Sequence, residues 1–238
     1  DLNLLHNGRS ELTMPVIVGE TKYKTPVFSH AMSYIEINPY WNIPPSIASE
    51  EIVEKMQNDP EYLKKKRIRI FDGWDRDAPE IPPEAVDWHS VGADIRKYRL
   101  RQEPGRNNAL GTIKFMFPNH SNIYLHDTPG QSLFRRARRA FSHGCIRVSR
   151  PLDLASQLLQ ADGQPRSKKR LQQQINSGKQ AVLVLKQPVP VHIVYLTVRI
   201  TADGIPQFYE DVYGRDALLA EGLFAADKNR PHAAMTHC

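Results

Sequence analysis

The chain has 238 residues, of which 40% are hydrophobic and 24% charged, and its formal net charge at pH 7 is +6. This balance is typical of a globular protein and excludes a disordered or collagen-like chain. Since no apolar run approaches the roughly 20 residues that a bilayer-crossing helix needs, we expect no membrane span. The positive charge favours an anionic partner without choosing between nucleic acid, anionic lipid and an acidic cell-wall polymer.

The first 40 residues show short strand patterns separated by turns. The predicted strands are residues 2–6, 12–18, 22–28 and 33–37. Asn7-Gly8 is a turn signal, and Gly19-Glu20 predicts a hairpin between the second and third runs. Asn38-Pro39 ends the fourth run. Short strands with this punctuation indicate a mostly β architecture.

Residues 41–109 differ in character, since they hold seven prolines and all three tryptophans, Trp41, Trp74 and Trp88. Ser49 before residues 50–57 predicts a capped short helix. The stretch is too long for an ordinary connection, so we interpret it as an inserted lid subdomain. Its tryptophans are either core residues or platforms that face a substrate groove. The basic run 64–67 is interpreted as a solvated face, with a binding patch as the less favoured alternative.

The strand pattern resumes at residues 111–117 and 122–126, and a helix is expected over 151–161 with Ser149 as its N-cap. A second helix over 167–177 and strands over 180–185, 191–200 and 207–212 follow, and a short helix is expected near 216–222. We therefore predict a main domain of residues 1–40 and 110–213, the insertion 41–109 and a tail 214–238. The predicted fold class is mainly β with a few helices (α+β).

Residues 140–151, AFSHGCIRVSRP, carry the chemistry that the sequence offers. Cys145 is either an inert buried thiol or a nucleophile, and a disulfide to Cys238 is disfavoured because terminal residues are usually mobile. His126 and His143 are candidate bases for the thiol. Gly144 allows a sharp bend that could aim backbone amides at an oxyanion. We expect the following helix to begin close to the thiol and to favour its thiolate.

At these residues the sequence resembles the L,D-transpeptidase catalytic domain of the YkuD family. The family motif pairs a strand-ending histidine, usually in HGT, with a downstream SHGC. Here the matching stretches are HDT at 126–128 and SHGCIR at 142–147. Similarity over about residues 4–212, with a long insertion after INPYW, resembles the YcbB-like subgroup, which carries a large substrate-capping subdomain. The resemblance implies a β-sandwich or mixed-sheet catalytic domain with an inserted lid.

The resemblance also implies a reaction. Cys145 would attack the carbonyl between diaminopimelate and the terminal D-Ala of a peptidoglycan tetrapeptide stem, releasing D-Ala and leaving a thioester. The amine of a second stem's diaminopimelate would then form a 3→3 cross-link. His126 takes the position of the base, oriented by the carbonyl of Asp127, and the amides of Gly144 and Cys145 are the oxyanion candidates. The resemblance also implies a role in wall biogenesis and cell shape, a periplasmic location, and covalent inhibition by carbapenem β-lactams. We expect no cofactor or metal.

Four further residues near the motif complete the predicted site. Arg147 could bind a substrate carboxylate or form a structural salt bridge. Asp127 stands where the family has glycine, and we group it with the substrate-binding residues. Its side chain either holds His126 or caps the turn. His143 is expected to give a supporting hydrogen bond. Ser142 is grouped with the substrate-binding residues, and its hydroxyl is expected to have a structural role. The arginine cluster at 135–139 is a solvated loop or a glycan-peptide contact.

Alternatives remain open at this point. The same acyl chemistry could serve an L,D-carboxypeptidase, or an enzyme that attaches or detaches a wall-anchored lipoprotein, because the acceptor depends on groove shape. A more remote alternative is a non-catalytic basic module that binds wall polymer or nucleic acid, although no nucleic-acid motif is present. The chain opens without a signal-peptide pattern, so we expect it to be a catalytic fragment of an exported protein.

Overall fold

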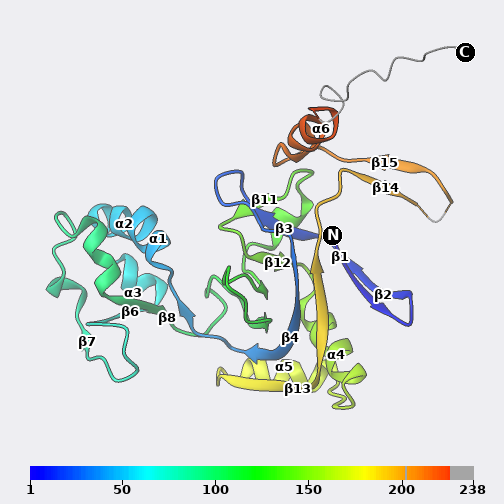
Figure 1. Cartoon of the computed structure of the whole chain (residues 1–238). Helices are drawn as coiled ribbons and strands as arrows, with labels where there is room; N and C mark the ends of the chain where they lie inside the picture. The colour runs from blue at the N-terminus through cyan, green and yellow to red at the C-terminus, as the bar shows by residue number, and fades with distance from the viewer. Residues whose placement is uncertain (202, 226–238) are drawn as a thin grey trace, which may run out of the picture.

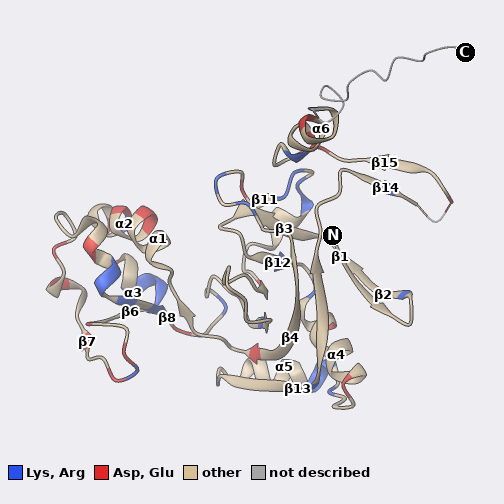
Figure 2. Ribbon diagram, in the orientation of Figure 1, with Lys and Arg blue, Asp and Glu red and all other residues tan. Residues whose placement is uncertain are grey.

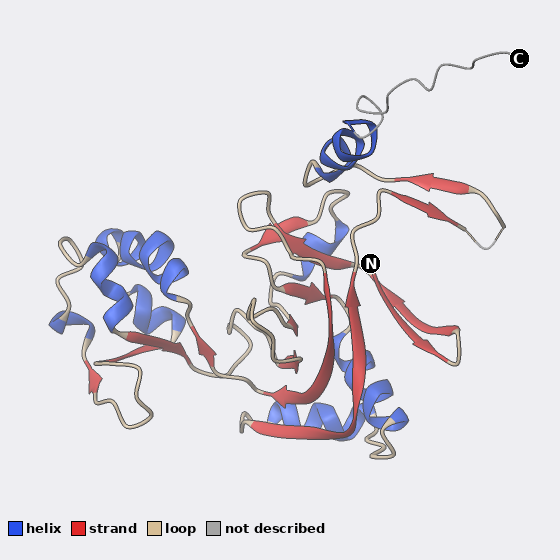
Figure 3. Cartoon of the chain, in the orientation of Figure 1, coloured by secondary structure: helices blue, strands red, loops and turns tan. Residues whose placement is uncertain are grey.

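The computed structural model describes residues 1–201 and 203–225 and confirms a mainly β fold with a few helices. Its largest sheet has the strand order β11-β3-β12-β10-β9-β4-β13 (Figures 1 and 3). These strands are β3 (Val16–Gly19), β4 (Phe28–Ile37), β9 (Ile113–Met116), β10 (Leu125–His126), β11 (Ala140–Ser142), β12 (Ile146–Val148) and β13 (Ala181–Ile193). Strands β10 and β12 are parallel neighbours, so the two motif segments meet in the sheet.

The N-terminal hairpin forms as predicted, and the next one does not. Strands β1 (Leu2–His6) and β2 (Arg9–Met14) pair across Asn7 and Gly8, both of which have positive φ. Residues 22–27, expected as a strand, form a loop instead. The buried Thr25 hydroxyl explains the difference, because it accepts from the Gly19 amide (2.9 Å) and donates to the Gly144 carbonyl (2.8 Å). The loop is thereby fixed against the cysteine motif.

Side chains alternate along each strand, so the two faces of the seven-stranded sheet have different surroundings. On one face Phe115, Leu125 and Ile146 pack into a core with apolar residues of α4 (Pro151–Ala161), such as Leu154 and Leu158. Helix α5 (Lys168–Asn176), whose N-cap is Ser167, adds Leu171 to this core. Because successive residues of a strand point to opposite faces, their neighbours along β9, β10 and β12 face the other side.

Two predicted helix caps are wrong. Helix α4 begins at Pro151 as expected, but its N-cap is Arg150 and Ser149 makes no capping bond. Strand β12 separates Cys145 from this helix, so the helix does not begin at the thiol as we expected. In the insertion, Pro45 begins a helical run composed of α1 (Pro45–Ile47), the π-helix η1 (Ala48–Ile52) and α2 (Val53–Asn58). Ser49 therefore lies inside the run, where its hydroxyl donates to the Ser46 carbonyl.

The insertion has a sheet and a core of its own. Its strands follow the order β5-β8-β6-β7 and comprise β5 (Trp41–Asn42), β6 (Ile68–Phe71), β7 (Glu80–Ile81) and β8 (Arg99–Gln102). The helix α3 (Tyr62–Lys66) and the 3₁₀ turns η2 (Pro83–Ala85) and η3 (Gly92–Lys97) complete it. Ile43, Leu63, Ile70, Ile95 and Leu100 are buried together in this second core. We call residues 41–109 the capping region, and these bounds stay a prediction.

The C-terminal part differs from expectation in its strand lengths. The two strands expected over 180–185 and 191–200 are one long strand, β13, followed by β14 (Val198–Ile200). Strand β15 (Pro206–Phe208) pairs with β14, and α6 (Arg215–Ala225) covers the expected short helix. The second cysteine, Cys238, lies outside the described residues. Over the described parts of the chain, helices that combine the length and the apolar character of a membrane span are not found.

Candidate active site

Strand register brings chemically active side chains into one row on the sheet face opposite α4 and α5. His126 on β10 pairs with Lys114 on β9 at one side and with Arg147 on β12 at the other. Tyr124 lies two residues before His126, and Cys145 directly precedes β12. The two motif segments, 20 or so residues apart, are therefore joined by parallel pairing rather than by a hairpin.

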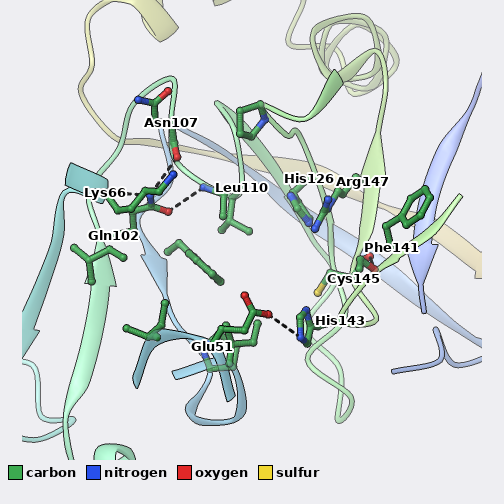
Figure 4. A pocket seen from close by; sticks show the side chains of 18 of the residues that line it. Glu51, Lys66, Gln102, Asn107, Leu110, His126, Phe141, His143, Cys145 and Arg147 are labelled. Carbon is green, nitrogen blue, oxygen red and sulfur yellow. Dashed lines mark hydrogen bonds and ion pairs between the residues drawn. The ribbon is translucent and has the colours of Figure 1, made fainter. Parts of the chain in front are cut away.

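A cavity of about 460 Å³ lies between this face and the capping region (Figure 4). The sheet side contributes Tyr124, His126, Ser142, His143, Cys145 and Arg147. The capping region contributes, among others, Trp41, Ile47, Glu51, Ile52, Tyr62 and Lys66. The predicted thiol and both histidines thus line one pocket. Of the tryptophans, Trp41 lines this pocket, while the indole nitrogens of Trp74 and Trp88 donate to backbone carbonyls within the capping region.

His126 is held as a neutral imidazole. Its Nδ1 lies 2.5 Å from the Asp127 carbonyl oxygen, and because a carbonyl only accepts, Nδ1 carries the proton. Burial, and next the charge of Arg147, lower the pKa of His126 to about 3. Backbone hydrogen bonds to Asp127 and Leu110 act in the opposite direction on this pKa. At neutral pH the ring is uncharged, and because Nδ1 holds the proton, Nε2 is the nitrogen with the free lone pair. The orienting carbonyl is the one that the family resemblance implies.

Cys145 is half-buried, and its Sγ lies 3.7 Å from the Asn122 carbonyl oxygen. Burial raises the pKa of the thiol. Hydrogen bonds from the backbone and hydroxyl of Tyr124, and the charges of Lys114 and Arg147, act in the opposite direction on this pKa. The resting pair is therefore a thiol and a neutral imidazole, which suits proton transfer during attack more than a preformed thiolate.

The loop that carries the thiol is shaped by Ser142 and Gly144. The Ser142 hydroxyl donates to the Cys145 carbonyl (2.5 Å) and accepts from the Gly144 amide (3.2 Å). Gly144 has φ +103°, a backbone conformation that residues with a side chain rarely adopt. Because the Gly144 amide is engaged by Ser142, the Cys145 amide is the better placed of the two oxyanion candidates. Ser142 thus has the structural task that its sequence position suggested.

Asp127 supports the turn and does not line the pocket. Its carboxylate accepts from the amide and hydroxyl of Thr112 (2.8 and 2.9 Å) and from the Thr128 amide (2.7 Å). Gly111 has φ +62°, and a Cβ there would lie 2.4 Å from the Asp127 carboxylate. The aspartate that replaces the family's glycine therefore ties β9 to β10, and the substrate contact that we considered is not supported by its position.

Arg147 points into the pocket without a protein partner for its charge. Among the described residues none forms an ion pair with it, and its buried Nε has no hydrogen-bond acceptor. A structural salt bridge, the alternative that the sequence left open, is not present in this part of the chain. Lys114 lies beside it in the row, with its ammonium 4.2 Å from the centroid of the Tyr124 ring. The site therefore offers a desolvated guanidinium that suits a carboxylate.

His143 connects the sheet to the capping region. Its Nε2 lies 3.1 Å from Oε1 of Glu51, and its ring packs at a tilt against Tyr23 with centroids 4.4 Å apart. This contact fits the supporting role expected for His143. Sequence reasoning missed Glu51, which looked like a surface residue of a short helix, and it missed Lys114 and Tyr124. Of these three, only Tyr124 could have been predicted from the sequence, because it lies two residues before His126 and residues two apart on a strand share a face.

The arginine cluster divides between structural and exposed residues. Arg139 contacts Asp1 (3.2 Å) and the Val16 carbonyl (3.1 Å), and Arg138 lies 3.8 Å from Glu210. Arg135 and Arg136 are exposed. Over the described residues, no group of three or more metal-ligating side chains is assembled.

Comparison with known proteins agrees with this geometry. The family model for the YkuD L,D-transpeptidase catalytic domain matches residues 2–191. A Haemophilus influenzae protein named "Putative L,D-transpeptidase" is 35% identical over 215 residues, which are 90% of this chain and 42% of the relative. The chain thus spans less than half of that protein's length. With the motif cysteine and histidine on one pocket and a family match over most of its length, the chain belongs to the YkuD family of L,D-transpeptidase catalytic domains.

Proposed function

We propose that this protein is a peptidoglycan L,D-transpeptidase that uses Cys145 as its nucleophile. The observation that carries the proposal is the placement of Cys145 and a neutral His126 on one pocket, with Nδ1 of His126 engaged and Nε2 left to accept a proton. Membership of the family supports the reaction type. The donor would be a tetrapeptide stem and the acceptor the diaminopimelate amine of a second stem, in a 3→3 cross-link.

The acylation step follows from these groups. As the sulfur attacks the carbonyl carbon, the thiol proton passes to Nε2 of His126, and the oxyanion forms near the Cys145 amide. When the tetrahedral intermediate collapses, the C–N bond breaks and His126 returns the proton to the leaving amine of D-Ala. A thioester remains on Cys145. The charge of Arg147 is available for a carboxylate of the donor stem.

Deacylation reverses the roles. The acceptor amine attacks the thioester carbon and gives a proton to His126, the C–S bond breaks, and the proton returns to the sulfur. Water in place of the amine would release a tripeptide, which is the carboxypeptidase outcome. We further propose that the protein acts in the periplasm, where its substrate is found, and that carbapenems acylate the same thiol.

The nucleophile is tested with a carbapenem and intact-protein mass spectrometry. We expect one covalent adduct on the wild type and on Cys238→Ala, and none on Cys145→Ala, because Cys145 lines the pocket beside His126. An adduct that persists in Cys145→Ala would refute the assignment. Purified disaccharide-tetrapeptide then separates the reactions: dimer with loss of D-Ala identifies a transpeptidase, and tripeptide alone identifies a carboxypeptidase.

A further inference from the structure

Glu51 places a carboxylate opposite the nucleophile. It lies on the π-helix η1 of the capping region, lines the same pocket as Cys145 and Arg147, and its side chain is 47% exposed. Oε1 is 3.1 Å from His143 Nε2, and Oε2 has no hydrogen-bond partner among the residues that the structure describes. One carboxylate oxygen is therefore positioned by the protein, and the other is open to a ligand. π-Helical turns are frequent at functional sites.

The charges around this carboxylate are otherwise positive. Arg147 and Lys66 line the pocket, and Lys114 lies in the row behind it. Glu51 is close enough to Arg147 to act on its pKa, in the direction that favours the charged guanidinium. A ligand's carboxylate would be attracted to the cations, whereas a ligand's ammonium would be repelled by them. Glu51 is the group in this pocket that can accept hydrogen bonds from an ammonium and balance its charge.

We propose that Glu51 binds the side-chain ammonium of a stem-peptide diaminopimelate. This inference rests on the proposed function and adds a residue that selects the substrate's amine. The ammonium can belong to the acceptor stem or to the donor stem, since both carry diaminopimelate. For the acceptor, the attack itself needs the free amine: the bound ammonium loses one proton to water, and the nitrogen then gives a second proton to His126 as the amide bond forms.

The neighbouring Glu50 provides a matched control. Its carboxylate does not line the pocket and accepts from Lys22 Nζ (2.7 Å) and from the Tyr23 hydroxyl. Glu50 and Glu51 thus share the same π-helical segment, but of the two only Glu51 lines the pocket. Figure 2 shows acidic positions along the helical run that includes α1 and α2. A loss that depends on contact between the capping region and the sheet should appear in both variants. A loss that depends on the amine should appear in Glu51→Gln alone.

The binding test uses a stem tripeptide that ends in diaminopimelate, with its side-chain amine either free or acetylated. The readout is the peptide concentration that half-protects Cys145 from iodoacetamide, so no turnover is required. In the wild type and in Glu50→Gln, we expect acetylation to weaken protection by roughly tenfold or more. In Glu51→Gln, acetylation should make no difference. An equal effect of acetylation in Glu51→Gln and wild type, its loss in Glu50→Gln as well, or no protection of the wild type would each overturn the inference.

Turnover of disaccharide-tetrapeptide then identifies the source of the ammonium. If Glu51→Gln loses dimer but keeps tripeptide, Glu51 holds the acceptor; if it loses both products but keeps the carbapenem adduct, Glu51 holds the donor. Unchanged yields of both products would overturn the inference. Failure of the proposed function has a different signature, namely a wild type that forms neither adduct nor product, and the protection test remains decisive in that case.

Discussion

At Cys145 and His126, burial favours the uncharged form of both side chains. It raises the pKa of the thiol and, together with the charge of Arg147, lowers the pKa of His126 to about 3. We had expected a nearby helix start to favour the thiolate, but β12 intervenes. A raised thiol pKa slows alkylation of Cys145 near neutral pH, because the thiolate is the reactive form. Reactivity at this site then depends on proton transfer in the transition state.

Arg147 links the two pKa values, so Arg147→Gln should move both. Loss of the guanidinium should raise the pKa of His126 from about 3 toward its ordinary value, and should raise the pKa of Cys145 further. NMR titration of the His126 ring and the pH profile of iodoacetamide alkylation measure the two shifts. The exposed Arg135→Gln serves as the control. If the His126 titration is the same in both variants, Arg147 does not act on this ring as we infer.

At the scale of elements, two neighbouring glutamates of η1 connect the capping region to the sheet. Glu50 contacts Lys22 and Tyr23 in the loop before β4, and Glu51 contacts His143 beside the thiol. The Tyr23 ring also packs against His143, so both contacts converge on one small area. These are solvent-exposed polar contacts, and contacts of this kind are individually weak. Weak polar contacts therefore join the capping region to the sheet beside the thiol.

We expect Glu50→Gln to open the capping region more often than in the wild type. Because the contact with Lys22 is exposed, the effect should be small, roughly two- to fivefold in the rate of limited proteolysis within residues 41–109. Mass spectrometry of the fragments locates the cuts. Glu54→Gln, an exposed glutamate of α2, should be cleaved at the wild-type rate. Equal rates for all three proteins would show that Glu50 does not hold the region closed.

For the whole molecule, the buried neutral His126 makes stability depend on pH. The unfolded chain binds this proton near pH 6.5 and the folded chain only near pH 3. Between these values the unfolded state carries more protons, so the free energy of unfolding falls as the pH is lowered through this window. One such group contributes a slope of up to roughly 1.4 kcal/mol per pH unit. The site therefore destabilises the fold in acid.

His126→Asn should flatten this dependence. Urea unfolding at several pH values between 7 and 4.5 gives the slope for each protein, and the comparison uses slopes, so a uniform loss of stability does not matter. His89→Asn, at an exposed histidine of the capping region, should keep the wild-type slope. A slope in His126→Asn as steep as that of the wild type would contradict the assignment of this titration to His126.

Local patterns in the sequence determined the fold class and many of the turns and helices of this protein. The turn Asn7-Gly8 and the start of α4 at Pro151 depend on interactions within a few residues, so both are visible in the sequence. The mainly β class follows from the same short-range signals. The pairing of SHGC with an upstream histidine identified the family, because both segments keep their residue types and order.

The tertiary structure alone decided what surrounds the thiol. Lys114, His126 and Arg147 become neighbours through the register of three strands, and Glu51 reaches the pocket from an inserted region. Asp127 looked like part of the substrate side and proved to be a tie between β9 and β10. Register and docking arise from contacts between residues far apart in the chain. Local periodicity shows which face a side chain takes, but it does not show which strand or which region will lie opposite.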